Sequence, residues 1–97
     1  MVTFKIQDFI NTNDNLSDAG KALYNAVLPY LEGEDKIILD FSGNMGIPTL
    51  FLNTSLGDLM DAYGINKIKK AFKYTNIQTT QAERIQKYFA DYENILK

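Results

Sequence analysis

Residues 36–63 constrain the fold of this 97-residue chain more than any other segment. They begin with an almost continuous apolar run over residues 37–41, in which Asp40 is the only charged residue. Such a run is typical of a parallel β-strand that is covered on both faces. A loop with glycine and proline follows, and then an amphipathic helix. Because binding sites in open α/β sheets lie beyond the carboxyl ends of the strands, residues 42–50 are the first place to look for function.

Two further apolar patterns predict strands, over residues 1–10 and residues 65–74. Helices are predicted from about Ser17 to Leu31, from about Thr49 to Tyr63 and from about Thr80 to Leu96. The order β-α-β-α-β-α predicts an α/β fold, a small sandwich whose mostly parallel sheet has three to four strands with alternating helices. The direction of the first strand stays open. At this length we expect one domain over residues 1–97.

Local signals refine the first two helices. Ser17 is a plausible N-cap, and Pro29 predicts a kink or break near residues 25–28, because an interior proline costs about 3 kcal/mol. Gly33 and Gly64 are natural helix ends. Gly57 lies among apolar residues of the second helix, which predicts close packing against the sheet.

The last helix opens with Thr80-Gln81-Ala82-Glu83, a sequence that predicts a capping box. Its apolar stripe is expected to be buried and consists of Ile85, Phe89, Tyr92 and Leu96.

Composition argues against several functions. The chain has no histidine and no cysteine, so thiol nucleophiles, the usual zinc sites and the commonest acid-base side chain are missing, and we expect no enzymatic activity, cofactor or metal. A net charge of −2 has the wrong sign for a nucleic-acid partner. Apolar runs are too short for a membrane span or a secretory signal, so we expect no membrane association and a cytoplasmic location.

Four sequence segments follow one another in a recognisable order. They are IILDFSG, then after about seven residues FLNTSLGDLM, then KIKKAFKYTN and a final helix ending in DYENIL. This succession resembles the STAS-like family, relatives of the anti-anti-sigma factor and sulfate-transporter domains. The resemblance covers residues 35–96, and residues 1–34 match in outline.

The resemblance implies a domain without catalytic machinery that docks onto a protein partner, in better-known members a kinase with a histidine-kinase-like ATPase fold. In those members a serine or threonine at the start of the helix after the central strand is phosphorylated, which breaks or remakes the complex. Counting without gaps from Asp40 puts this position at Leu50, beside Thr49, whereas aligning the SLGDL word puts it at Asn53 or Thr54. Thr49 and Thr54 are therefore the candidate phosphorylation sites, although the Asp-Ser-Ser-Gly signature of the family is absent.

The expected partner-binding surface is the loop and helix start, with Ser42, Asn44, Thr49, Asn53 and Thr54 as its candidate residues. Each hydroxyl also has a structural interpretation. Thr49 is placed to cap the helix, and Thr54 and Ser55 are placed to bond the preceding helical turn.

Other polar groups have two interpretations each. Asp40, Asp58 and Asp61 suggest a metal or acid-base pair, but a solvated helix face and bonding of Asp40 to its own loop explain them better. The loop glycines lack the spacing of a P-loop and favour turn geometry. A basic cluster consists of Lys67, Lys69, Lys70 and Lys73. It is either a solvated face that protects a sheet edge or a docking patch for an acidic partner.

Two functions remain as rivals of docking onto a protein partner. STAS-like relatives suggest that a small ligand or a nucleotide is bound, and a self-associating structural module is the third hypothesis. The sequence does not fix the oligomeric state.

Overall fold

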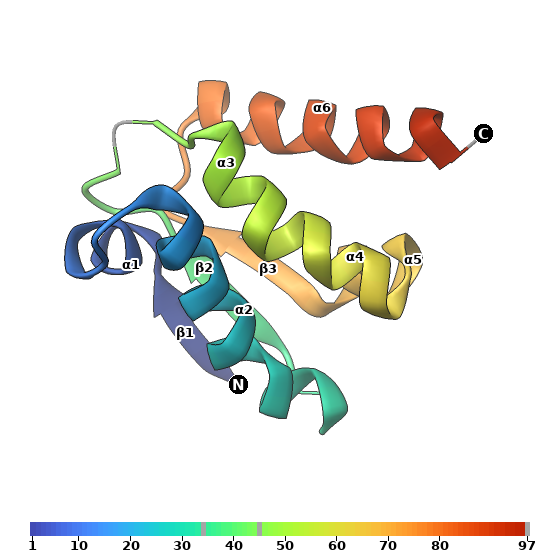
Figure 1. Ribbon diagram of the computed structural model, residues 1–97, viewed down its shortest axis with the longest axis horizontal. Helices are drawn as coiled ribbons and strands as arrows, with labels where there is room; N and C mark the ends of the chain where they lie inside the picture. Colours follow the sequence, from blue (N-terminus) through green and yellow to red (C-terminus); the bar gives the residue numbers. More distant parts are fainter. Residues whose placement is uncertain (34, 45, 97) are drawn as a thin grey trace.

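A three-stranded sheet with helices packed on one side forms the body of the protein (Figure 1). The computed structural model describes residues 1–33, 35–44 and 46–96, with Leu96 described by its backbone alone. In chain order the elements are β1 (Val2–Lys5), α1 (Ile6–Thr12), α2 (Leu16–Glu32), β2 (Ile37–Asp40), α3 (Thr49–Leu52), the π-helical turn η1 (Asn53–Gly57), α4 (Asp58–Tyr63), α5 (Ile65–Ala71), β3 (Phe72–Thr75) and α6 (Thr79–Leu96).

The strand order is β1-β2-β3, and both pairs of strands are parallel. In register, Val2 lies opposite Ile37, and Ile37 lies opposite Phe72. The prediction of an α/β fold with a mostly parallel sheet is confirmed. The direction of β1, which the sequence left open, is parallel to β2.

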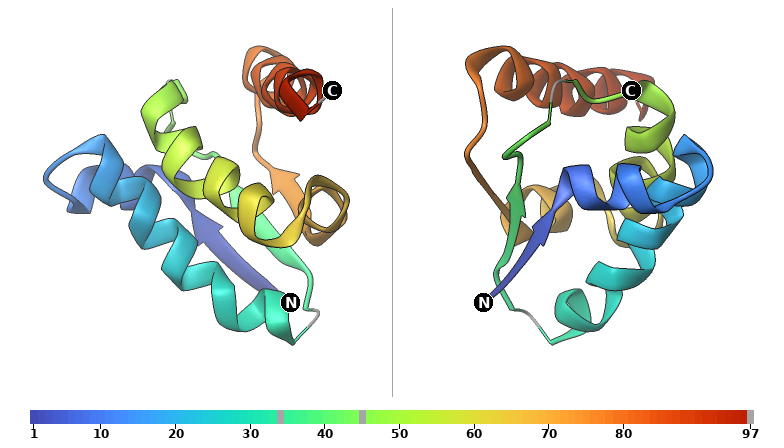
Figure 2. Two further views of the ribbon diagram at one scale, coloured as in Figure 1. Left: turned by 45° about the vertical axis from the view of Figure 1, so that its right-hand side comes forward. Right: turned by 90° about the vertical axis from the view of Figure 1, so that its left-hand side faces the viewer.

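Helices α2 and α3-η1-α4 cover one face of this sheet, as the two views of Figure 2 show. Ile37 and Leu39 of β2 point to that side and are buried. On the other side Ile38 lies in register between Thr3 and Lys73, which are exposed, and Ile38 itself is only half-buried. The expectation that β2 is covered on both faces is therefore wrong, and its apolar run reflects one buried face and one partly sheltered residue.

The first predicted strand is much shorter than expected, because the chain turns into α1 at Ile6. Ile6, Phe9 and Ile10 have helical spacing, so the alternation that predicted a strand fits a helix equally well after residue 5. Ile6 is buried, and the ring of Phe9 lies edge-on to that of Phe4 at 6.0 Å.

The third predicted strand is also mostly helix. Residues 65–71 form α5, and β3 begins only at Phe72. Ile65 and Ile68 are three residues apart and lie on one side of the helix, where Ile68 is buried. Of the basic cluster, Lys67, Lys69 and Lys70 are exposed on α5, and Lys73 is exposed on β3. Lys69 and Lys70 occupy the last turn of α5, where cations are favourable.

Helix α2 begins one residue before Ser17. Asn15 is its N-cap, and its side-chain oxygen accepts a hydrogen bond from the backbone N–H of Asp18 at 2.8 Å. The helix runs unbroken to Glu32, so a break near residues 25–28 is wrong, and the alternative of a kink stays a prediction. Pro29 lies exposed in the last turn, and Gly33 ends the helix as predicted.

The second predicted helix extends over residues 49–63, as expected, but contains the π-helical turn η1, which the sequence did not predict. Gly64 follows it with φ 88°, a conformation that favours glycine, and ends α4 as predicted. Gly57 does pack closely, but against α6: a Cβ at this position would lie 2.5 Å from the hydroxyl of Tyr88.

Helix α6 begins two residues earlier than the predicted capping box would place it. Gln81 takes the capping role, because its Oε1 accepts a hydrogen bond from the backbone N–H of Gln78 at 2.9 Å. Ile85 and Phe89 are buried as predicted and Tyr92 is half-buried, whereas the side chain of Leu96 lies outside the described part. Of the helices that the structure describes, none has the length and apolar character needed to cross a membrane.

Candidate functional site

The loop after β2 is anchored at its start by Asp40. Oδ1 of Asp40 accepts hydrogen bonds from the backbone N–H of Ser42 at 2.9 Å, from the Ser42 hydroxyl at 2.6 Å and from the Asn76 amide at 3.0 Å. The prediction that Asp40 bonds its own loop is confirmed. These bonds, that of the Ser42 hydroxyl first, lower the pKa of Asp40 from 3.8 to about 2.

The Asp40 carboxylate should therefore make its contribution to stability above about pH 4 and lose it as the pH falls through about 2, because the folded state favours the charged form. Replacing Ser42 with alanine removes one of the three bonds and should raise the pKa of Asp40 towards 3.8. Carboxyl ¹³C chemical shifts recorded across an acid titration measure this directly. An unchanged midpoint in Ser42→Ala would show that the hydroxyl does not hold the carboxylate.

Asn44 braces the loop between two helices. Its side-chain amide donates to Oε1 of Gln7 in α1 at 2.9 Å, and its Oδ1 accepts from the Gln81 amide of α6 at 2.8 Å. Gln81 also donates to the backbone oxygen of Asn44 at 3.0 Å. Since Asn44 is only 4% exposed and its polar groups are paired, it has a structural role, and we leave it out of the docking surface.

Thr49 does not cap its helix. Pro48 is the N-cap residue, and the hydroxyl of Thr49 instead accepts a hydrogen bond from Nη2 of Arg84 in α6 at 2.6 Å. Nε of Arg84 donates to the backbone oxygen of Ile47 at 2.5 Å. The guanidinium thus ties the end of the loop and the start of α3 to α6.

Two more contacts of this kind continue along α6. The hydroxyl of Tyr88 donates to Oδ1 of Asn53 at 2.8 Å, and the hydroxyl of Tyr92 donates to the carboxylate of Asp61. We call the three contacts Arg84–Thr49, Tyr88–Asn53 and Tyr92–Asp61 the polar ladder. Its residues are spaced by four on α6 and by four or eight on the facing helix, so the contacts advance in the same direction along both.

The polar ladder borders a groove of about 260 Å³ whose lining includes Thr49, Asn53, Arg84 and Lys87. The bond to Asp61, followed by burial, raises the pKa of Tyr92 to about 12, so this phenol stays protonated near neutral pH. The sequence-based candidates did not include Arg84, Tyr88 or Tyr92. The sequence signal that could have indicated these contacts is the spacing of four residues, which Thr49 and Asn53 share with Arg84 and Tyr88.

Thr54 and Ser55 lie on other sides of the same helix. Oγ1 of Thr54 donates to the backbone oxygen of Leu50 at 2.9 Å, and Oγ of Ser55 donates to that of Phe51 at 2.6 Å, as predicted for residues within a helix. Ser55 is buried, and Thr54 is half-buried against Gly20 of α2. The structure therefore brings Thr49 and Asn53 together and places Thr54 elsewhere.

Leu50 stands out beside Thr49 because it is 49% exposed, although the next two residues of the helix are buried. Asp58 and Asp61 are exposed, in agreement with a solvated helix face. In the described part of the chain, no group of three or more potential ligand residues could hold a metal ion.

Comparison with protein families gives one match that spans most of this fold. The model of the STAS-like domain of unknown function (DUF4325) matches residues 19–82, which is more than half of the chain and includes β2, β3 and the helix that carries Thr49. Searches of curated proteins and of solved structures found no match. Together with the parallel sheet and the loop and helix that follow β2, this match shows that the chain belongs to the STAS-like domain family.

Proposed function

We propose that this protein is a small cytoplasmic regulatory domain without enzymatic activity, and that it docks a protein partner through the start of α3. The surface consists of Ser42, Thr49, Leu50 and Asn53. The observation that supports it best is the exposure of Leu50, at 49%, beside two polar side chains on an ordered helix. An exposed apolar residue flanked by polar ones resembles the centre and rim of a protein interface.

The partner that we propose is a histidine-kinase-like ATPase, as in better-known members of the family. Support for this partner comes from family membership alone. The absence of histidine and cysteine from the chain is consistent with a domain that recognises rather than catalyses.

Thr49 is the better candidate for a phosphorylation switch. It is exposed, its hydroxyl contacts Arg84, and Lys87 lines the same groove. A phosphate would add a charge of about −1.5 to −2 next to Arg84, whereas Lys87 is already paired with the carboxylate of Asp91 at 3.0 Å. Thr54 is less suitable, because its hydroxyl already packs against Gly20.

The substitution Leu50→Lys should reduce recovery of the partner about tenfold, equivalent to 1.4 kcal/mol of binding free energy. Leu50 makes no side-chain contact of the polar ladder, so the substitution changes the surface without releasing α6. Quantitative pull-down from native lysate, with each recovered protein compared between wild type and variant, measures the effect.

Asn25→Lys is the matched control, because Asn25 is exposed on α2 and gains the same charge. Urea denaturation establishes that both variants are folded. Equal recovery of every protein by wild type, Leu50→Lys and Asn25→Lys would exclude the start of α3 as the docking surface.

A further inference from the structure

Strand β1 lies at one edge of the sheet, and its outer side is unpaired. It pairs with β2, and in the part of the chain that the structure describes no strand lies on its other side. The right-hand view of Figure 2 looks onto this side of the sheet, and no helix passes in front of β1. We call the outer side of β1 the free edge. An edge of this kind is a template on which another strand can pair.

The ladder between β1 and β2 determines which backbone groups the free edge presents. The backbone N–H of Val2 donates to the oxygen of Lys36 at 3.1 Å, so Val2 turns its backbone groups towards β2. By alternation, the N–H and C=O of Thr3 and the N–H of Lys5 point outwards. The C=O of Met1 also points outwards, because it belongs to the same trans peptide as the N–H of Val2. These outward groups are arranged symmetrically about Thr3.

The side chains beside the free edge are less covered than those of β2. Phe4 points to the same side of the sheet as Leu39 opposite it, yet Phe4 is half-buried whereas Leu39 is 1% exposed. The rings of Phe9 and Tyr30 pack edge-on to Phe4 at 6.0 and 5.8 Å. A groove of about 360 Å³, lined in part by Phe4 and Phe9, lies between β1 and α1. Met1, next to β1, is 82% exposed. A further strand would cover these apolar groups.

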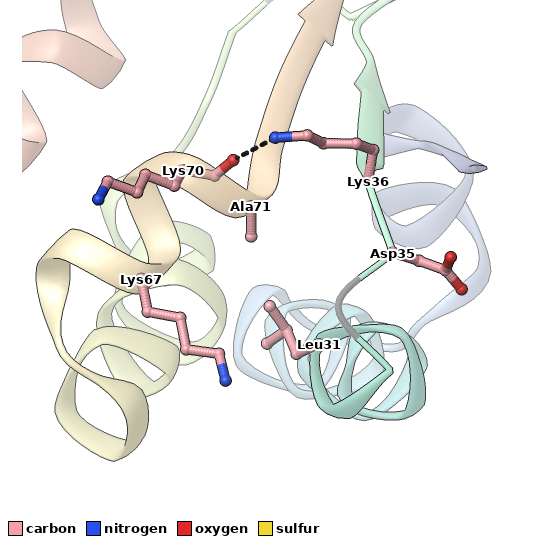
Figure 3. A pocket seen from close by; sticks show the side chains of 6 residues that line it. All are labelled: Leu31, Asp35, Lys36, Lys67, Lys70 and Ala71. Carbon is pink, nitrogen blue, oxygen red and sulfur yellow. Dashed lines mark hydrogen bonds between the residues drawn. The ribbon is translucent and has the colours of Figure 1, made fainter.

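Lys36 holds the start of β1 in place. Its backbone oxygen accepts the bond from Val2, and its Nζ donates to the backbone oxygen of Lys70 at the end of α5 at 3.2 Å (Figure 3). All of β1 lies in register with β2. The free edge is therefore extended and fixed before anything binds to it, which lowers the entropy cost of pairing.

We propose that the free edge pairs with the free edge of a second copy of this chain, in antiparallel orientation about a twofold axis beside Thr3. In this register the N–H of each Thr3 donates to the C=O of the other. The N–H of each Lys5 donates to the C=O of Met1 in the other copy. Every outward group named above is then paired, and the two sheets join into one. This goes beyond partner docking at α3 and does not depend on it.

The side chains of this register favour a second copy over an unrelated strand. Each Phe4 lies opposite Val2 of the other copy, and the two Thr3 side chains lie opposite each other; an aromatic with a β-branched residue and threonine with threonine are both favourable cross-strand pairs. Lysine on an edge strand commonly opposes pairing. Here each Lys5 lies opposite Met1 of the other copy, so its alkyl chain covers an exposed apolar group, and the two lysines stay at opposite ends of the interface.

Dilution tests the pairing. An interface of one short strand belongs to the small, transient class, so we expect a dissociation constant on the order of 0.1 mM. Amide chemical shifts and hydrogen exchange of ¹⁵N-labelled protein are followed over a dilution series around this concentration, together with sedimentation equilibrium. The amides of Thr3 and Lys5 should shift and become more protected as concentration rises, while that of Leu50 stays unchanged. Concentration-independent amides at the free edge, or species larger than a dimer, would overturn the proposal.

Two opposite charges at Thr3 test the twofold register. Thr3→Lys and Thr3→Glu each place like charges directly opposite one another, so each should weaken self-association about fivefold. An equimolar mixture of the two variants should restore association to at least the wild-type level, because opposite charges then face each other. Thr3 is exposed, and its N–H points away from β2, so neither variant should disturb the fold, which urea denaturation checks.

Thr80→Lys is the matched control, because Thr80 is an exposed threonine on α6, and it should leave self-association unchanged. Equal weakening by Thr80→Lys and Thr3→Lys would mean that overall charge, not the free edge, governs association. A mixture of Thr3→Lys and Thr3→Glu that associates no better than either variant alone would show that the two Thr3 side chains do not face each other. Either result would overturn the proposal.

Discussion

Phe51→Ala is expected to lower the free energy of unfolding by about 3–5 kcal/mol, the usual cost of removing a fully buried aromatic side chain. Phe51 is 1% exposed and packs among buried residues of α2, β2 and α6, including Leu23, Leu39 and Ile85. The void beside it is only about 10 Å³, so the side chain fills its site. Urea denaturation of wild type and variant measures the loss.

The neighbouring Leu50→Ala is the matched control. Because Leu50 is 49% exposed, its replacement should cost less than about 1 kcal/mol. If the two losses were equal, the orientation of α3 described here would be wrong. The expected difference separates the two roles that we assign to this helix, since Phe51 holds the core while the exposed Leu50 belongs to the proposed docking surface.

The central segment of the chain was predictable because its signals are local. The apolar run of β2, the extent of the helix over residues 49–63 and the two hydrogen bonds from Ser42 to Asp40 depend on residues close together in the sequence. Gly64 likewise ends its helix through local backbone geometry, with φ at 88°.

The errors arose where two periodicities overlap. Ile6 and Ile10 fit both a strand of period two and a helix with a four-residue repeat, and the structure has a helix there. The segment that contains Ile65 and Ile68 was predicted as a strand and forms helix α5. Short segments contain too few residues to separate these patterns. Packing of the whole domain determines whether such a segment becomes a strand or a helix.

Contacts between distant segments could not be read from either segment alone. Arg84 lies 35 residues from Thr49, and its bond depends on how α6 is placed over α3. The same contact explains why the hydroxyl of Thr49, which was predicted to cap its helix, instead bonds Arg84 of α6. Asn44 changed in the same way, from a candidate of the docking surface to a buried brace between Gln7 and Gln81.

The close crossing of α2 and the helix after the loop gives the second large effect. A Cβ on Gly20 would lie 1.8 Å from Oγ1 of Thr54 and 2.8 Å from the backbone oxygen of Phe51. Gly20→Ala should therefore destabilise the protein by about 2 kcal/mol, because overpacking outweighs the gain of about 1 kcal/mol from replacing glycine in a helix. Gly33→Ala is the control, since its nearest neighbour would be 3.5 Å away.

A double-mutant cycle identifies which atom causes the clash. Thr54→Ala removes Oγ1 but leaves the Phe51 oxygen in place, so Gly20→Ala should cost about 1 kcal/mol less in the Thr54→Ala background than in wild type. Full additivity, measured by urea denaturation of all four proteins, would show that Thr54 does not contact residue 20. The expected coupling also bears on the proposed phosphorylation switch. A phosphate on Thr54 needs far more room than one methyl group, so it would have to separate α2 from η1, whereas a phosphate on the exposed Thr49 would lie beside Arg84.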